Sequence, residues 1–200
     1  MRNTIHSVLR YSFKTRKTWW FTAIAKTKAR YARTALGSFW LDISTLMTVL
    51  CLGFVYGTVF NVSNFKEYFI YLGIGLVIWT PISEAINQAP LIFITNSNSL
   101  KNSTIKPIFF VCQEWAFQVQ SFIQAFIMVF VVFLIFSPGL VLNLVAAPLH
   151  FFNLLLFIFW LQLLISLLGT KFTDLFQLLP IITNLLFLLS PILYVKKSLG

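Results

Sequence analysis

Charged residues are scarce in this sequence, and that scarcity excludes an ordinary soluble domain. Of 200 residues, 10% are charged and 58% are hydrophobic, and Asp and Glu together number only 5. Soluble domains carry about 25% charged residues, because their surface must face water. The mean hydropathy is +0.86, which means that the chain has more apolar side chains than the core of a soluble domain can bury. We therefore expect an integral membrane protein whose surplus apolar surface faces lipid.

The sequence also lacks the motifs of nucleotide hydrolysis and metal chemistry. It has no G-x-x-x-x-G-K-[ST] loop, no H-E-x-x-H pair and no clustered Cys and His. Cys51 and Cys112 both lie in apolar runs and provide no disulfide framework. We expect no catalytic residue, no metal site and no cofactor bound by this chain. Any energy source must be a partner or an ion gradient.

What the sequence does contain is a series of long apolar runs. A helix needs about 20 apolar residues to cross a bilayer. Five runs reach that length: 36–60, 68–94, 107–136, 140–168 and 172–195. The break between the last two is short, so one long kinked element is an alternative there. We predict an all-α integral membrane fold with five transmembrane helices in a domain spanning 36–200.

Prolines inside the apolar runs predict kinks or local breaks, because proline cannot donate a helical hydrogen bond. A carbonyl freed in this way must find a partner inside the protein. These prolines are Pro81, Pro90, Pro148 and Pro180.

Basic residues are concentrated in an N-terminal segment, 1–35. Nine of the 15 Lys and Arg lie in the first 33 residues, with no acid among them. Directly before an apolar run, such a segment indicates a cytosolic region near anionic headgroups and not a nucleic-acid surface. With the N-terminus inside, twelve basic residues fall on the inner side and three on the outer side. We expect a multi-pass protein of the cell inner (cytoplasmic) membrane with a cytoplasmic N-terminus.

Within this segment, 18–31 mixes aromatic and basic residues. Trp20 and Tyr31 lie near one helical face, whereas Lys26 and Arg30 turn elsewhere. This pattern is typical of an amphipathic helix in the inner membrane interface, with its cations at headgroup level. A helix packed on a partner is the alternative.

Polar residues recur on one face of several apolar runs. At membrane depth polar side chains are costly, so their helical phase is the best functional signal. Interhelical hydrogen bonds of about 0.6–2 kcal/mol each are the alternative for any single residue. Together, stripes of uncharged amides and hydroxyls among aromatic residues suit a path for a hydroxyl-rich cargo such as a sugar. The candidate path residues are Asp42, Tyr56, Thr80, Ser83, Glu84, Asn87, Asp174, Gln177 and Asn184.

Three carboxylates fall at membrane depth. Asp42 and Glu114 lie in the cytosolic third of their runs, where water or a basic residue is within reach. Glu84 lies deeper and is the candidate for a proton relay. The alternative for Glu84 is a buried carboxylate paired with a neighbouring donor.

The junction between the basic segment and the first run carries the pattern R-Y-x-x-T-x-L-G-x-x-W. Its residues are Arg30, Tyr31, Thr34, Leu36, Gly37 and Trp40. Further segments that match family motifs follow this junction in the expected order: 68–79, 96–107, and the pair 172–174 and 189–194. Together these motifs resemble the ABC-2 type permeases over 20–195. Within that family the chain is most similar to exporters of polysaccharides and polyol phosphates, which serve O-antigen, capsule and teichoic acid export.

The resemblance implies a transport subunit and not an enzyme. It implies a channel formed with a second copy of the chain and powered by a separate ATPase subunit that holds ATP and Mg. A cytosolic loop would contact the ATPase through Asn96, Ser97, Asn98, Ser99, Leu100 and Lys101. The interfacial helix and the start of the first span would involve Trp19, Trp20, Arg30, Tyr31, Arg33 and Trp40. Without the resemblance, this polar loop would be interpreted as ordinary solvated chain.

The sequence departs from the family at two points. Thr173 replaces the usual basic residue before Asp174, which leaves Lys171 as the nearest cation for that acid. The family has six spans and this chain supplies five, so we expect a truncated product or a fragment.

The leading hypothesis is therefore the permease subunit of an ABC exporter for a lipid-linked polysaccharide. Its partners would be the ATPase subunit, a second copy, the lipid-linked glycan and membrane lipid. Two alternatives are an ion-coupled secondary carrier that uses Glu84 and a non-transporting membrane assembly factor.

Overall fold

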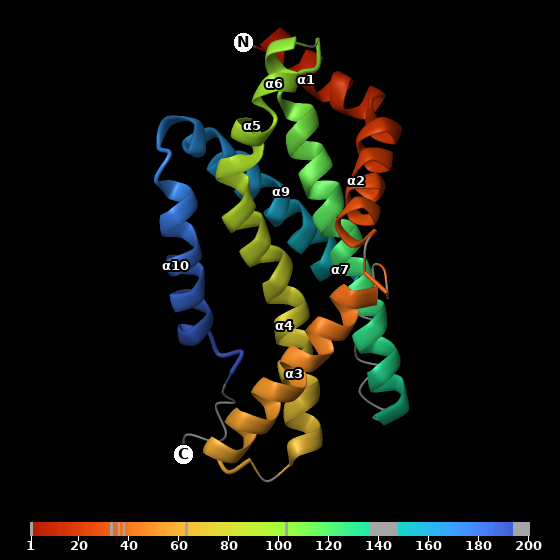
Figure 1. Ribbon diagram of the computed structural model, residues 1–200, viewed down its shortest axis with the longest axis vertical. Coiled ribbons are helices and arrows are strands. Elements are labelled where there is room, and N and C mark those ends of the chain that lie inside the picture. The colour runs from red at the N-terminus through yellow and green to blue at the C-terminus, as the bar shows by residue number, and fades with distance from the viewer. Residues whose placement is uncertain are drawn as a thin grey trace.

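The computed structural model describes residues 2–32, 34–35, 37, 39–62, 64–102, 104–136 and 148–193. Within these residues every regular element is a helix, which confirms the predicted all-α fold (Figure 1). α4, α7 and α10 run roughly along the long axis of the molecule, whereas α3 and α9 cross it obliquely, and shorter helices gather at the end that holds the N-terminus.

All five predicted apolar runs form helices. These are α3 (Phe39–Val59), α4 (Phe65–Gln88), α7 (Ile108–Phe136), α9 (Pro148–Lys171) and α10 (Leu175–Leu189). Among the described residues, three helical stretches are long and apolar enough to cross a membrane: Phe65–Thr95, Ile108–Val132 and Leu149–Lys171. Two shorter apolar helices are Ile43–Val59 and Leu175–Leu189.

The ends of the helices differ from the predicted runs where the local backbone turns. The first run was predicted from 36, but α3 begins at Phe39, after a turn in which Gly37 has a φ of +58°. A positive φ is easiest for glycine, because it has no Cβ. The predicted start of the fourth run, 140–147, lies outside the described residues. The short break after Lys171 is confirmed, because α10 is a separate helix.

The prolines interrupt helices to different degrees. Pro90 lies in a short 3₁₀ segment, η1 (Ala89–Leu91), which separates α4 from α5 (Ile92–Thr95). Pro81 and Pro180 lie inside continuous helices. Pro148 is the first residue of α9, where its missing N–H costs no helical hydrogen bond.

The backbone of α9 passes very close to η1. A Cβ added to Gly169 would lie 2.5 Å from the Cα of Pro90, a distance that real Cβ atoms do not reach. Glycine at this position therefore allows α9 to pack directly on the backbone of η1.

Two helices in the basic N-terminal segment complete the fold. α1 (Arg2–Lys14) was not predicted, and α2 (Arg16–Tyr31) corresponds to the predicted interfacial helix. They meet at Thr15, whose hydroxyl donates to the carbonyl of Tyr11 at 2.9 Å. Both helices contact α7.

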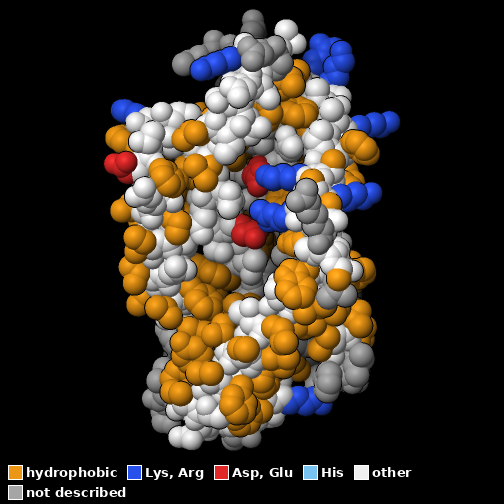
Figure 2. Space-filling view, viewed as in Figure 1, with side chains coloured by type: hydrophobic (Ala, Val, Ile, Leu, Met, Phe, Trp, Pro, Cys, Tyr) orange, Lys and Arg blue, Asp and Glu red, His pale blue; other side chains and the backbone are white. Residues whose placement is uncertain are grey.

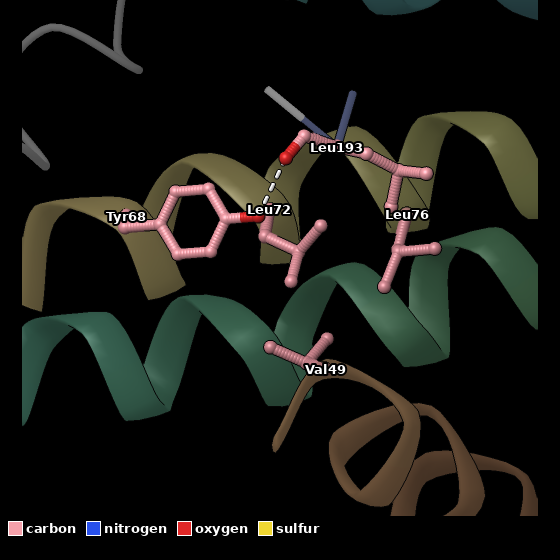
Figure 3. Packing of buried hydrophobic residues seen from close by; sticks show 5 residues of the cluster. All are labelled: Val49, Tyr68, Leu72, Leu76 and Leu193. Atoms are coloured by element: carbon pink, nitrogen blue, oxygen red, sulfur yellow. Dashed lines mark hydrogen bonds between the residues drawn. The ribbon is translucent and has the colours of Figure 1, made fainter. Parts of the chain in front are cut away.

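The core lies along α4 and α7, which contact each other and most of the other helices. One cluster joins the α3–α4 hairpin to the segment after α10, through Val49, Tyr68, Leu72, Leu76 and Leu193 (Figure 3). In it the Tyr68 hydroxyl donates to the Leu193 carbonyl at 2.5 Å, and Tyr71 donates in the same way to Pro191. The chain after α10 is therefore held against α4.

The two ends of the molecule differ in charge. α1, α6 (Ser97–Asn102) and the α9–α10 turn lie at one end, which we call the α6 end (Figure 1). The α3–α4 turn lies at the opposite end, the hairpin end. Basic side chains gather at the α6 end and on α2 (Figure 2). Among the described residues, Lys66 is the one Lys or Arg in the α3–α4 hairpin.

Candidate functional site

The site begins where α2 docks on α7. Ala23 of α2 and Ala116 of α7 are fully buried against each other and Phe117. Small residues at such a contact let two helices approach closely. Trp19 adds an edge-to-face contact with Trp115, with ring centroids 6.1 Å apart. α2 is therefore fixed to the helical bundle along this face.

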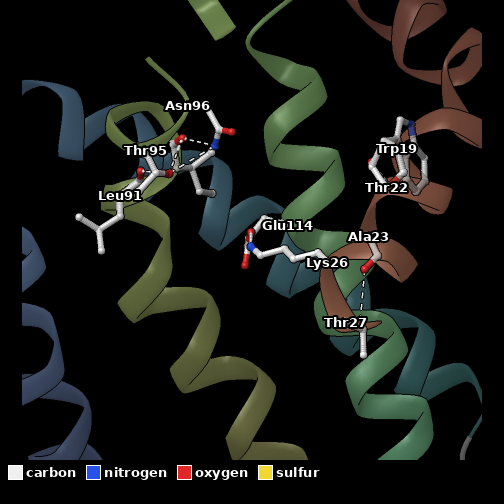
Figure 4. A network of polar contacts seen from close by, with 10 residues as sticks. Trp19, Thr22, Ala23, Lys26, Thr27, Leu91, Thr95, Asn96 and Glu114 are labelled. Atoms are coloured by element: carbon white, nitrogen blue, oxygen red, sulfur yellow. Dashed lines mark hydrogen bonds and ion pairs between the residues drawn. The ribbon is translucent and has the colours of Figure 1, made fainter. Parts of the chain in front are cut away.

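Two of the five cations of α2, Lys26 and Arg30, lie on this docked face. Lys26 forms an ion pair with Glu114, and the side chains meet on the side of α7 that faces α4 (Figure 4). The Lys26 amine and the Arg30 guanidinium lie 5.0 and 4.8 Å from the ring centroid of Phe117. Lys26 thus pairs with a mostly buried carboxylate on α7, a contact that the predicted arrangement at headgroup level did not include. Arg30 and Trp20 are both exposed, Trp20 at 37%.

Between α2, α4, α5 and α7 lies an open cleft of about 380 Å³. The polar residues of its lining are Lys26, Arg30, Gln88, Thr95, Asn96, Gln113 and Glu114. Acidic and basic side chains meet in this hollow (Figure 2). The cleft can thus offer hydrogen-bond donors and acceptors of both signs.

Polar residues continue beyond the cleft toward the middle of the molecule. Thr45, Thr80, Glu84, Gln118 and Ser121 line a small cavity of about 20 Å³ between α3, α4 and α7. Gln118 is 1% exposed, and neither of its amide atoms has a hydrogen-bond partner among the described residues. A cavity of this size has room for about one water, which could satisfy the amide.

The sequence places this cavity next to the cleft. Gln118 lies one helical turn after Glu114 on α7, and Glu84 lies one turn before Gln88 on α4. Arg30, Glu114 and Lys26 all act electrostatically on Glu84. The cleft and cavity therefore form one polar zone that reaches from the α6 end into the bundle.

Several predicted path residues lie in or beside this zone, and others lie elsewhere. Thr80 and Glu84 line the small cavity, and the Ser83 hydroxyl donates to the Thr80 carbonyl at 2.9 Å. Asn87 faces α10, where the Thr183 hydroxyl donates to its amide oxygen at 3.1 Å. The side chain of Asp42 lies outside the described residues.

Tyr56 is not part of the polar zone. It packs on the hairpin-end cluster and stacks on Phe60, with ring centroids 5.9 Å apart. Thr45 and Tyr56 are three turns apart on α3, or roughly 16 Å along the axis, because a helix rises about 1.5 Å per residue. Within one chain, Tyr56 therefore lies apart from the polar zone, and its place on a translocation path stays a prediction.

The polar stripe on α10 faces away from the rest of the chain. Asp174, Gln177 and Asn184 are all exposed, whereas Thr183 is buried against α4. The structure therefore does not bring this stripe to the cleft within one chain. Lys171 lies over the ring of Phe172, 5.4 Å from its centroid. Among the described side chains, Lys171 and Asp174 are not within the 4.0 Å of an ion pair.

Most of the predicted coupling segment forms the short helix α6, and its contact with an ATPase stays a prediction. Asn96 ends α5, and its side-chain amide donates to the Ile92 carbonyl at 2.7 Å. Leu100 packs on the cluster that contains Ile92 and Phe109. Ser97 and Leu100 are partly covered, whereas Asn98, Ser99 and Lys101 are exposed at the α6 end.

The remaining motif residues lie at the start of α3. The Thr34 hydroxyl donates to the Tyr31 carbonyl at 2.9 Å, and the Trp40 amide donates to the Gly37 carbonyl at 3.3 Å. Trp40 is exposed. Arg33 and Leu36 lie outside the described residues. The described part of the motif forms the turn from α2 into α3.

The ion pair of Lys26 and the unpaired amide of Gln118 were not selected from the sequence as site residues. Lys26 and Glu114 are 88 residues apart, so no local pattern connects them. Gln118 was one of several polar residues on α7 with equal periodic support. Only the packing of α7 against α3 and α4 distinguishes it.

Comparison with known proteins gives one family. The sequence profile described as ABC-2 type transporter matches residues 19–200, which include α3 to α10 and most of α2. A comparison with curated proteins finds no match. Members of this family are transport subunits rather than enzymes and have an ATPase partner subunit. The chain therefore belongs to the ABC-2 type transporter family, as a multi-pass membrane permease of an ABC transporter.

Proposed function

We propose that this permease exports a lipid-linked polysaccharide, of the O-antigen or capsule type, across the cytoplasmic membrane. A separate ATPase subunit, which holds ATP and Mg, supplies the energy. The family match favours this ATP-driven permease over an ion-coupled carrier and over a non-transporting assembly factor.

The observation that carries the proposal is the exposed polar stripe on α10. Gln177 and Asn184 are uncharged amides on an apolar helix, and Asp174 lies at its start. Polar groups at membrane depth face water or protein and not lipid, because lipid cannot satisfy them. This face therefore suits contact with a second copy and a polar path between the two. Amides hydrogen-bond sugar hydroxyls without selecting for charge.

In the proposed orientation, the charged cleft opens at the cytosolic side of the permease. The basic residues of α1, α2 and α6 lie at the same end as the cleft, and the positive-inside rule puts that end in the cytosol. The exposed helix α6 lies at this end too, where an ATPase can reach it. A movement of α6 would act directly on the cleft, because Asn96 lies in the cleft wall and precedes α6.

Deletion of the permease gene tests the proposal. We expect surface polysaccharide to disappear and lipid-linked chains to accumulate inside the cell. Complementation with the wild type should restore export. Replacing both amides, Gln177→Leu with Asn184→Leu, should lower export while the protein still assembles with its ATPase. Leu186→Ile, on the opposite side of the same helix, is the matched control.

Normal surface glycan in the deletion strain would rule out the polysaccharide substrate. Unchanged export by the double amide variant would rule out the stripe as part of the path. If Glu84→Gln alone abolished transport while ATP turnover stayed cargo-stimulated, the ion-coupled alternative would replace the proposal.

A further inference from the structure

A large apolar cavity lies at the hairpin end, away from the charged cleft. It has a volume of about 580 Å³ and lies between α3, α4 and α7. Leu46 and Leu50 of α3, Phe69 of α4, and Val129 and Val132 of α7 form much of its wall. This volume is within the range of about 300–1,000 Å³ for sites that bind small molecules.

The chemistry of this wall excludes a hydroxyl-rich ligand. Every lining residue except Lys66 is apolar, so a sugar would lose its hydrogen bonds to water without replacement. Leu50 is 54% exposed, so the cavity opens to the surroundings of the helices. An acyl chain fits both facts, since it is apolar and can enter from the bilayer.

Lys66 gives the cavity a charged end. It is exposed, in the first turn of α4, and it lines the cavity. Among the described side chains, no carboxylate lies within 4.0 Å of its amine, although Glu67 is the next residue. A cation in the first turn of a helix gains nothing from the helix dipole, whereas an anion there is stabilised. An anionic headgroup would thus find favourable charge at this point.

From this arrangement we infer that the cavity binds one anionic glycerophospholipid of the bilayer. One acyl chain fills the space between α3, α4 and α7, and the phosphate pairs with Lys66. The site is separate from the polar path and does not depend on which cargo the permease exports. The lipid would fill the gap between the start of α4 and the far end of α7.

Photocrosslinking tests this inference in vesicles that contain phosphatidylglycerol with a photoreactive acyl chain. We expect labels to concentrate in 46–50, 69–73 and 129–132. Lys66→Glu should lower this labelling about fivefold, because a lysine near a lipid surface contributes about 1 kcal/mol. Lys66→Arg should retain it. Val132→Trp, which fills the cavity, should lower labelling by phosphatidylglycerol and phosphatidylcholine alike.

Lys171→Glu is the matched control, since it makes the same charge change at the α6 end. It should leave labelling in the cavity segments unchanged. Helix content and elution profile identify any variant that does not fold, and Lys66→Gln then replaces Lys66→Glu.

Two outcomes would overturn the inference. Labelling of these segments that is equal for phosphatidylcholine and insensitive to Lys66→Glu would identify bulk lipid. The second outcome combines absent lipid labelling with a disulfide between two copies of the Leu50→Cys variant, made in a background with Cys51→Ser and Cys112→Ser. This result would show that a second copy covers the cavity wall.

Discussion

Lys26 and Glu114 show how much one residue pair can determine in this fold. The carboxylate of Glu114 is 11% exposed and the lysine side chain is 39% exposed, so the pair lies at the boundary between cleft and interior. Removing the cation leaves a mostly buried carboxylate without its partner, which costs more than losing the attraction between two exposed groups. The pair also fixes the position of α2 on α7 beside Phe117.

Lys26→Ala should therefore lower the free energy of unfolding by about 1–3 kcal/mol, less than for a fully buried pair. Thermal unfolding in detergent would measure this. Adding Glu114→Gln should recover part of the loss, because the unpaired charge is removed. Lys28→Ala, on the exposed side of the same helix, is the control. Equal losses for Lys26→Ala and Lys28→Ala would contradict a specific ion pair.

Among the elements, α6 combines an anchored side with an exposed side. Leu100 packs on the cluster around Ile92, while Lys101 remains exposed at the α6 end. Because α6 is anchored on one side, a displacement imposed on it by a partner can be transmitted to the helical bundle. An unstructured loop would absorb such a displacement. This arrangement suits the proposed contact with the ATPase.

On the proposed coupling role, Lys101→Glu should weaken binding of the ATPase about tenfold without lowering the stability of the permease, because the residue is exposed. Copurification of the two subunits measures the first effect and thermal unfolding the second. Lys106→Glu makes the same charge change at the same end but outside α6. Equal ATPase recovery from both variants would remove α6 as the specific contact.

At the scale of the whole molecule, charge is divided between the two ends. Lys66 lies in the first turn of α4 at the hairpin end, whereas most other described Lys and Arg residues lie on α1, α2 and α6. Lipid surfaces on the cytosolic side are anionic and attract clustered Lys and Arg. This division is the basis of the proposed orientation, with the N-terminus in the cytoplasm.

Single cysteines would test this orientation in a background with Cys51→Ser and Cys112→Ser. A membrane-impermeant thiol reagent should label Glu67→Cys from outside the cytoplasmic membrane. Asn98→Cys on α6 should react only after that membrane is permeabilised. Both positions are exposed, so access to the thiol is comparable. The reverse labelling pattern would place the N-terminus outside.

The sequence predicted the helices well because length and apolar content alone identify a span. Pro90 also predicted the break at η1 correctly, because proline has no backbone N–H to donate to a helical hydrogen bond. Periodicity could not tell which face of a helix meets protein, because lipid and protein interior are both apolar. For this reason the docked face of α2, centred on Ala23, and the contact of Thr183 with Asn87 emerged only from the structure.

The close approach of α9 to η1 couples the position of α9 to that of η1. η1 joins α4 to α5 and so to α6, while Gly169 on its other side is followed within a few residues by the turn into α10. At this contact the two backbones touch, so no side chain between them can change its rotamer to absorb a displacement. Closely packed interiors transmit strain. A shift imposed on α6 would therefore tilt α9 and α10 together. The outward polar face of α10 would then move together with α6, the helix proposed to contact the ATPase.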